Sequence, residues 1–422
     1  MNKTNQILER ILFSLILLFP ITFFLRSLIL NFFIILVSLI FIIISINKRY
    51  NFFKFDYNKI LLLFFSYFFI SQLFISLDIE KLIKTFFLLK FFLLFNATIY
   101  TFTYIKKDYL KKLLIFLFSF MIFFIIDLYV QYFLNFNIFG LEPSFCDAKT
   151  LKCLRYSGLF GSELVAGGYI SLVVTSIFIL ANTIYKNEFL KIIPLILLLT
   201  VYITGERTAL VVMLIFNIFY YSRFLKFKLS NIIFGVLIVS FFFIFTKESS
   251  RYRYSSDIMN LVKNDNNLSL IDSIKTTPWG LHYGASLLMI KDKPLFGNGY
   301  KSFKKNCKNY EYLNTRIKNR HHVCSSHPHN YHLEILVDTG IIGYSLFLIF
   351  IYFVILNFFS IKIIRENKLF FIMFFYLVIL LFLPRPTGSI VSTFFGAMLW
   401  YSFGLILGSV NLMNYISKNK VI

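Results

Sequence analysis

The sequence predicts an all-α fold, a polytopic bundle of about 12 transmembrane helices with one long, partly helical loop on its outer side. Hydrophobic residues make up 58% of the chain and charged residues 15%, which excludes an ordinary soluble domain. Apolar runs long enough to cross about 30 Å of hydrocarbon recur along the whole chain. Basic residues gather in alternate connections between these runs.

Each predicted span is an apolar run bounded by polar or charged residues. The runs are 11–25, 28–46, 60–77, 82–104, 113–134, 164–184, 189–204, 208–221, 232–245, 333–361, 369–383 and 390–412. The first run looks like a secretory signal peptide, but it lacks a small-residue cleavage site and leads directly into a second span. We therefore expect it to be a helix of the bundle.

The distribution of charge predicts the orientation of the bundle. The chain has 43 Lys and Arg against 20 Asp and Glu. Nearly half of the basic residues lie at the two termini and in the segments 48–59, 106–112, 186–191, 223–228 and 362–368. Because basic residues stay on the cytoplasmic side, both termini are expected in the cytoplasm. The excess of basic residues is thus explained by the orientation of the bundle in the membrane, and no nucleic-acid partner is expected.

The spacing of the apolar runs divides the chain into three parts. Residues 1–245 hold helices 1–9, residues 246–332 form the long outer loop, and residues 333–422 hold helices 10–12. Loops of such length are usually functional. Within the loop, 283–290 reads as a short helix and 292–300 as a turn. The cytoplasmic connections are short and contain no phosphate-binding loop, which argues against ATP-driven chemistry.

The cysteines and histidines both fall outside the cytoplasm. Cys146 and Cys153 share one outer loop, and Cys307 and Cys324 share the long one. Two disulfides, Cys146–Cys153 and Cys307–Cys324, are therefore predicted, with four free thiols as the alternative.

All six histidines lie in the long loop: His282, His321, His322, His327, His329 and His332. Histidine suits proton transfer near neutral pH. The segment 321–329 is also rich in zinc-ligand types, but its spacing fits no closed ligand pattern, and no metal or other cofactor is expected.

One segment joins this histidine-rich loop to a membrane helix. His329-Asn330 is followed by nine residues, Gly340, two residues and Gly343. Asn330 is expected to cap the helix, and the free N–H groups of the first turn suit a bound phosphate. A histidine at this positive end is biased towards its neutral form. The two glycines are expected to let a neighbouring helix pack closely. An interfacial histidine followed by small packing residues is the alternative interpretation.

This segment resembles the signature of the O-antigen ligase and polymerase superfamily, His-Asn followed by nine residues and Gly-x-x-Gly. Three more segments resemble family motifs in the same order. They are Arg155-Tyr-Ser-Gly-Leu-Phe-Gly with Glu163 and Gly167-Gly168, Thr204-Gly-Glu-Arg207, and Pro294-Leu-Phe-Gly297-Asn-Gly299. Many family members carry a second arginine before the helix that precedes this last turn. Here the region reads Thr277-Pro-Trp-Gly-Leu-His282, and the candidates to replace the arginine are His282, Arg251, Arg253 and Arg320.

The resemblance implies a metal-independent glycosyltransferase of the bacterial inner membrane with a periplasmic active site. The donor would be a glycan on undecaprenyl diphosphate, and the acceptor lipid A–core or another lipid-linked sugar, both embedded among membrane lipids. His329 would be the catalytic base, and Arg207 the cation that stabilises the departing diphosphate. An interface anchor or a partner of Glu206 is the alternative role of Arg207. The substrate contacts would come from Arg155, Glu163, His282, Asn330 and Arg320, and the structural glycines are Gly297, Gly299, Gly340 and Gly343. A local salt bridge is the alternative for Arg155 and Glu163.

Two other functions compete with a ligase. A polymerase of the same superfamily would extend repeat units on the carrier. A lipid or polysaccharide transporter would explain the many spans, but transporters place their polar residues at mid-membrane on broken helices. Asp127 lies inside a predicted span, where an ionisable residue indicates function or a bond to a neighbouring helix.

Overall fold

The structure, a computed structural model, is an all-α bundle, as predicted. It describes residues 3–25, 27–143, 145–146, 153–185, 188–224, 246–263, 277–309, 324–360, 368–382 and 386–418. Within these residues the only sheet is a two-stranded antiparallel one, formed by β1 (Phe145–Cys146) and β2 (Cys153–Arg155).

Eight helical segments of the described chain are long and apolar enough to cross a membrane, by length and composition alone. They are α1 (Lys3–Thr22), α2 (Ser27–Lys48), α3 (Asp56–Ile75), α4 (Ile79–Phe86) with α5 (Leu89–Tyr104), α6 (Lys107–Leu134), α7 (Ala166–Tyr169) with a π-helical turn (Ile170–Val174) and α8 (Thr175–Ile184), α16 (Tyr331–Ser360), and α18 (Thr393–Lys418). Three more apolar helices are α9 (Ile193–Thr204), α10 (Arg207–Phe224) and α17 (Lys368–Leu380). Each corresponds to a predicted run, and the predicted span 232–245 lies outside the described residues.

Local sequence explains where several helices start and stop. The side chain of Asp78 accepts the N–H of Lys81 and caps α4. Pro194 occupies the first turn of α9, where its missing N–H costs nothing. Asn135 after α6 and Gly205 after α9 take left-handed conformations, with φ of 61° and 71°, that end each helix.

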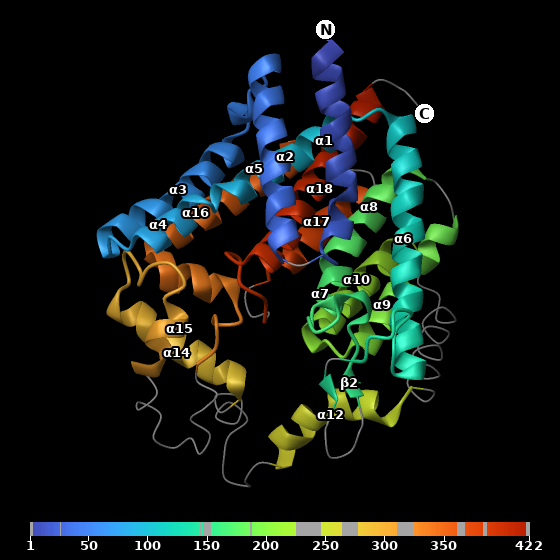
Figure 1. Cartoon of the computed structure of the whole chain (residues 1–422), viewed down its shortest axis with the longest axis vertical. Helices are drawn as coiled ribbons and strands as arrows, with labels where there is room; N and C mark the ends of the chain where they lie inside the picture. The colour runs from blue at the N-terminus through green and yellow to red at the C-terminus, as the bar shows by residue number, and fades with distance from the viewer. Residues whose placement is uncertain are drawn as a thin grey trace.

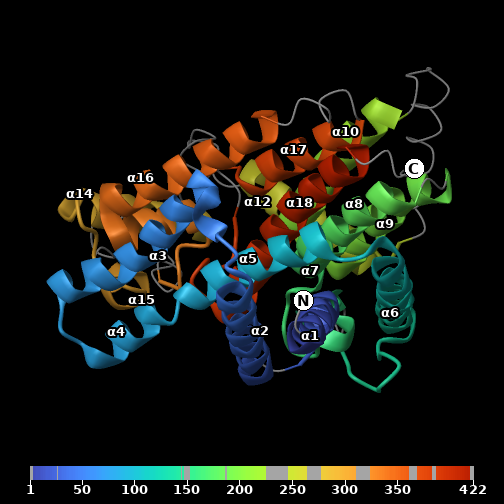
Figure 2. The ribbon, with the colours of Figure 1, turned by 90° about the horizontal axis from the view of Figure 1, so that it is seen from above.

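Helix α18 forms the centre of the bundle and packs most extensively against α5 (Figures 1 and 2). The close approach depends on two glycines one turn apart. A Cβ at Gly404 would lie 2.7 Å from the carbonyl oxygen of Phe95, and one at Gly408 would lie 2.8 Å from the Cβ of Phe102. Small residues at this spacing let membrane helices pack backbone to backbone.

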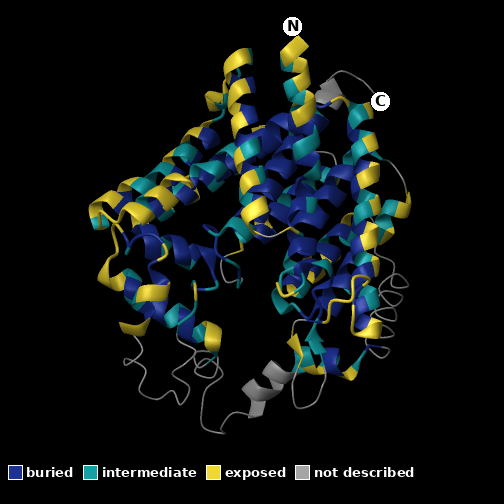
Figure 3. Ribbon diagram, in the orientation of Figure 1, coloured by how far each residue is buried: buried dark blue, intermediate teal, exposed yellow. Residues whose placement is uncertain are grey.

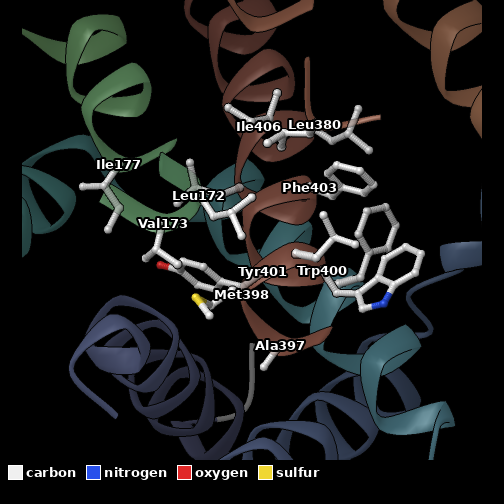
Figure 4. Packing of buried hydrophobic residues seen from close by; sticks show 14 of the residues in the cluster. Leu172, Val173, Ile177, Leu380, Ala397, Met398, Trp400, Tyr401, Phe403 and Ile406 are labelled. Atoms are coloured by element: carbon white, nitrogen blue, oxygen red, sulfur yellow. The ribbon is translucent and has the colours of Figure 1, made fainter. Parts of the chain in front are cut away.

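The core around α18 is apolar and aromatic. Trp400 and Tyr401 are fully buried, and Leu172 and Val173 of the π-helical turn pack beside them (Figure 4). Exposed residues follow the outer faces of α1, α2 and α6 and also lie along α3 and α4 (Figure 3), and they include large apolar side chains such as Phe32. An apolar outer face is what a helix facing lipid requires.

The chain ends and the connecting elements lie at opposite ends of the bundle. In Figure 1 both termini are at the top, whereas β2, α12 (Glu248–Lys263), α14 (Pro278–Asp292) and α15 (Phe303–Asn306) are at the bottom. The two disulfides, Cys146–Cys153 and Cys307–Cys324, belong to this lower end.

Candidate active site

The first half of α16 is held by the turn that follows α14. The N–H groups of Asn298 and Gly299 donate to the carbonyls of Val337 and Asp338, at 2.7 and 3.0 Å. In return the N–H of Ile341 donates to the carbonyl of Pro294 at 2.8 Å. These bonds join the Pro-x-x-Gly-x-Gly turn to the Gly-x-x-Gly segment, although about forty residues separate them in the chain.

Gly340 interrupts α16 rather than lying within a continuous helix. Its φ is 66° and its ψ −167°, so residues 331–339 and 341–360 form two helical halves with a kink between them. A Cβ at Gly340 would lie 2.6 Å from the nitrogen of Gly297, and a Cβ at Gly297 would lie 2.5 Å from the nitrogen of Gly340. The expectation of simple helix packing is therefore wrong for Gly340, because the opposing backbone is the turn. Gly343 does face a neighbouring helix, since its Cβ would meet Tyr67 of α3 at 3.0 Å.

A buried carboxylate of α16 completes the turn. Asp338 accepts the N–H of Lys301 at 2.8 Å and both the N–H and the hydroxyl of Ser302, at 3.1 and 3.0 Å. Gln72 of α3 accepts the N–H of Tyr300 at 3.0 Å. Gly299, at φ 92°, supplies the left-handed conformation that the turn needs at this point.

A second buried carboxylate of α16, that of Glu334, binds the segment before α18. It accepts the hydroxyl of Ser389 at 2.5 Å and the N–H of Ile390 at 2.9 Å. Sequence reasoning missed both Glu334 and Asp338. The signal was present, because two acidic residues four positions apart in an apolar span demand partners.

Asn330 caps α16 as the sequence predicts. Its side-chain oxygen accepts the N–H groups of His332 and Leu333, at 2.9 and 3.1 Å. Its side-chain oxygen is thus occupied in shaping the helix start. Directly before it, His329 has a φ of 55°, a left-handed conformation uncommon outside glycine. The carbonyl of His329 accepts the N–H of Thr387 at 2.7 Å.

Three of the predicted histidines meet at this helix start. The ring centroid of His329 lies 5.2 Å from that of His282 in α14 and 4.3 Å from that of His327. His327 contacts the carbonyl of Thr387 through Nε2 at 3.3 Å. The Cys307–Cys324 disulfide ties the same segment to the end of α15. We refer to His282, His327 and His329 as the histidine cluster.

The surroundings of His327 and His329 favour neutral imidazoles. Burial lowers the pKa of His329 below its ordinary value. Burial, together with the neighbouring His329, lowers the pKa of His327 to about 4. A neutral imidazole can accept a proton, which is the property that a general base needs.

Of the remaining histidines, the structure describes only His332, which does not join this cluster. His332 lies inside α16, with Nε2 3.0 Å from the carbonyl of Leu381 and Nδ1 3.3 Å from the hydroxyl of Tyr344. His321, His322 and Arg320 lie outside the described residues. Among the residues that are described, no group of three or more His, Cys, Asp or Glu side chains is arranged to hold a metal ion.

Arg207 belongs to a second group, which we call the arginine cluster: Arg155, Arg207 and Arg253 with Glu206. Arg207 begins α10, and its Nε and a terminal nitrogen donate to the carbonyl of Arg253 in α12, at 3.0 and 2.5 Å. The Nε of Arg253 donates to the carbonyl of Gly205 at 3.3 Å. Burial and the charge of Arg155 lower the pKa of Arg253, so three guanidinium groups share this small region.

Glu206 organises the arginine cluster. Its two oxygens accept the N–H groups of Gly167 and Gly168 at the start of α7, at 2.7 and 3.0 Å. Its carboxylate lies 3.9 Å from the guanidinium of Arg155, which also donates to the carbonyl of Leu164 at 3.0 Å. The segment that begins with Arg155 and the turn Thr204-Gly-Glu-Arg207 therefore meet at the Glu206 carboxylate. Glu163, which follows Arg155 in the first segment, is exposed.

Asp127 has a structural role in the same region. It is buried in α6 and accepts the N–H of Ile138 at 3.0 Å and the amide of Asn137 at 3.3 Å. The side-chain oxygen of Gln131, one turn further, accepts the N–H groups of Ser157 and Gly158. The bonds of Gln131 support the loop that carries Arg155, whereas those of Asp127 hold the connection after α6.

The four sequence motifs thus form two clusters, and both are built on elements at the same end of the bundle (Figure 1). A comparison with protein-family models matches residues 192–348 to the family described as O-antigen ligase. The matched region contains Arg207, the Gly297–Gly299 turn, His329 and Gly340. No curated protein matches the chain. Residues 192–348 are thus similar to an O-antigen ligase domain, which supports the O-antigen ligase superfamily for this chain, and its long apolar helices support a multi-pass membrane protein.

Proposed function

We propose that this protein is an O-antigen ligase-like glycosyltransferase that moves a glycan from undecaprenyl diphosphate to lipid A–core on the periplasmic side of the inner membrane. The observation that carries the proposal is the position of His329. Its half-buried imidazole stands directly before the capped end of α16 and beside two other histidines. The family match supports the same reaction class.

The proposed step needs a base but no ATP. The acceptor hydroxyl oxygen forms a bond to the anomeric carbon while the bond from this carbon to the diphosphate breaks. The bonding electron pair leaves with the diphosphate, and His329 takes the hydroxyl proton. General base catalysis of this kind contributes roughly 10²–10⁴-fold to a rate.

The arginine cluster is proposed to bind the departing diphosphate. Guanidinium groups pair bidentately with phosphate oxygens and keep their charge at any physiological pH. Arg207 is the first choice, with Arg155 and Arg253 beside it. Arg253 is our candidate for the second arginine of the family, because its side chain and that of Arg207 contact each other's backbone segments.

Transfer by purified protein tests the role of His329. The full-length chain in liposomes, given a lipid-linked glycan donor and rough lipopolysaccharide, should attach the glycan. His329→Ala should lower this rate by about 10²-fold or more without changing the thermal unfolding midpoint. Lys84→Ala, an exposed residue of α4, serves as the control and should transfer normally. Equal transfer by His329→Ala, or carrier flipping without transfer by the wild type, would refute the proposal.

A gene deletion separates ligase from polymerase. Loss of a ligase leaves core lipopolysaccharide without attached O-antigen of any length. Loss of a polymerase leaves core that carries a single repeat. The first gel pattern is the result expected here.

A further inference from the structure

Lys247, the residue before α12, is held by two tyrosine rings. Its ammonium lies 5.1 Å from the ring centroid of Tyr132 in α6 and 5.6 Å from that of Tyr156, in the loop after β2. The two rings meet edge to face, with their centroids 5.0 Å apart. The ammonium also donates to the side-chain oxygen of Asn135, the residue that ends α6, at 3.0 Å. Because aromatic rings attract a cation placed over them, the side chain of Lys247 joins α6, the loop and α12.

The backbone of Lys247 fixes the start of α12 at the same place. Its N–H donates to the hydroxyl of Tyr132 at 2.5 Å. Its carbonyl accepts the N–H groups of Ser250 and Arg251, at 3.0 and 3.2 Å, two donors of the first helical turn. The side chain and the backbone of Lys247 therefore both tie the first turn of α12 to the end of α6.

A second pair of tyrosines holds the next turn of α12 against α9. The hydroxyl of Tyr254 donates to the carbonyl of Tyr202 at 2.7 Å, and the two rings stack with their centroids 4.8 Å apart. The hydroxyl of Tyr202 in turn lies 3.3 Å from that of Thr246, the residue before Lys247. The chain is thus held at positions 246, 247 and 254, and Arg253 lies between the last two.

The placement of α12 decides where two guanidinium groups of the arginine cluster lie. Arg253 is itself a residue of α12, and its Nε donates to the carbonyl of Gly205 at 3.3 Å. Its carbonyl accepts the Nε and a terminal nitrogen of Arg207, at 3.0 and 2.5 Å. A shift of α12 would therefore move the guanidinium of Arg253 and also the acceptor that orients Arg207. Displacements of about 1 Å can cost up to about 10²-fold in the rate of an enzyme.

We propose that Lys247 is a positioning residue that, through α12, places the guanidinium groups of Arg207 and Arg253 on the diphosphate of the lipid-linked donor. This inference rests on the proposed function, in which the arginine cluster binds that diphosphate. Lys247 acts through the helix, because its ammonium is directed at Asn135 and the rings of Tyr132 and Tyr156.

Binding of undecaprenyl diphosphate to the full chain in phosphatidylcholine nanodiscs tests this role. Lys247→Met keeps the length of the side chain but removes the charge, and it should weaken binding by about tenfold or more. Lys247→Arg, whose guanidinium can lie over the same rings, should recover most of the affinity. Tyr132→Phe keeps the ring but removes the hydroxyl that accepts the N–H of Lys247, and it should weaken binding to a smaller extent. Lys84→Met, which replaces an exposed lysine of α4, is the matched control and should bind like the wild type.

A background without the two arginines separates positioning from direct contact. In a protein that already carries Arg207→Ala and Arg253→Ala, Lys247→Met should weaken binding further by less than about twofold, because the groups that Lys247 positions are gone. A lysine that touched the diphosphate itself would still cause the full loss in this background, and that result would overturn the inference.

The remaining outcomes are also decisive. Lys247 has no positioning role if Lys247→Met and Tyr132→Phe both bind like the wild type, or if Lys247→Arg binds no better than Lys247→Met. Thermal unfolding identifies variants that do not fold, and if Lys247→Met is one of them, Tyr132→Phe carries the comparison with the wild type. A wild type that binds undecaprenyl diphosphate but transfers nothing would overturn the proposed function and leave the role of Lys247 standing. Transfer that is normal in Lys247→Met would refute the role of Lys247 alone.

Discussion

Hydrogen bonds fix the backbone on both sides of the His329 side chain. Its carbonyl is bound by Thr387, and the next residue, Asn330, is bound into the cap of α16. A left-handed conformation of a non-glycine residue costs about 1–3 kcal/mol, and such residues persist where surrounding contacts fix them. The direction of the imidazole is therefore set by the backbone, and contacts with His282 and His327 complete its surroundings.

The decline of the transfer rate at low pH should reflect the burial of His329. Burial lowers the pKa of His329, so the neutral, proton-accepting form persists below the ordinary histidine value of about 6.5. As pH falls from 8, transfer should stay constant past about 6.5 and decline only at lower pH. The measurement is the initial rate against pH, with binding of the donor followed in parallel.

A decline that begins above about pH 6.5 would mean a raised pKa and would contradict burial as the dominant influence. His329→Gln, which cannot take up a proton at these pH values, should show no acid limb in whatever rate remains. The comparison separates titration of His329 from a general loss of the fold at low pH.

Much of this site could be predicted from residue types and spacing. The cap at Asn330 follows from a polar residue ahead of an apolar run, and the grouping of histidines in one loop is visible in the chain. Which histidines meet could not be predicted. His332 is only three residues from His329, yet it faces Leu381 and Tyr344, because a helix turns it towards α17 and away from the cluster.

At the scale of elements, the kink in α16 decides where the helix start lies. The turn 294–299 hydrogen-bonds to carbonyl and N–H groups that the kink exposes. The backbone N–H and C=O groups inside a helix normally bond to each other. At the kink the turn supplies the missing donors and acceptors, and this stabilises the break. The kink and the turn therefore depend on each other.

Gly340→Ala should disrupt this arrangement. The added Cβ would lie 2.6 Å from the nitrogen of Gly297, and the φ of 66° disfavours any L side chain. We expect a loss of roughly 2 kcal/mol or more in unfolding free energy and a comparable loss of transfer. Thermal unfolding and the liposome assay measure the two effects.

Gly284→Ala in α14 is the matched control. Beyond the local backbone of α14, no atom lies within 4 Å of a Cβ built at Gly284, and alanine favours a helix by up to about 1 kcal/mol relative to glycine. This variant should be as stable as the wild type or more so. If Gly340→Ala behaved like Gly284→Ala, the kink would have no structural importance.

The sequence predicted a single uninterrupted span at 333–361, because hydropathy is continuous across Gly340. A glycine in a helix is tolerated at modest cost, so its presence alone does not indicate a break. The break comes from contacts with a distant turn, which no local pattern reveals. Conversely, nothing in the sequence singles out Gly404 and Gly408, although they permit the most extensive helix pairing of the described core, that of α18 with α5.

At the scale of the whole molecule, both clusters lie on elements at the end of the bundle away from the termini (Figure 1). Eleven of the predicted spans appear as helices because apolar length is a strong signal. The relative position of two clusters could not be predicted, because it depends on how tilted helices pack. The boundaries of the three sequence parts remain a prediction.

Labelling with a membrane-impermeant maleimide tests the sidedness of the bundle. Lys293→Cys, in the turn after α14, should react in intact cells stripped of their outer membrane, whereas Lys3→Cys should react only after lysis. The four native cysteines are paired and should stay silent. Labelling of Lys3→Cys in intact cells would reverse the orientation, and labelling of both would contradict a single insertion topology.

The contacts of His329 and α16 also bear on attempts to exchange this domain between relatives. The family match covers residues 192–348, yet Gln72 and Tyr67 of α3 and Thr387 before α18 lie outside it. A graft limited to the matched region would carry His329 and Gly340 into a host that supplies different neighbours. Chimeras should therefore transplant α3 and the segment 387–393 together with the domain, because a graft without them would leave the carbonyl of His329 without the N–H of Thr387.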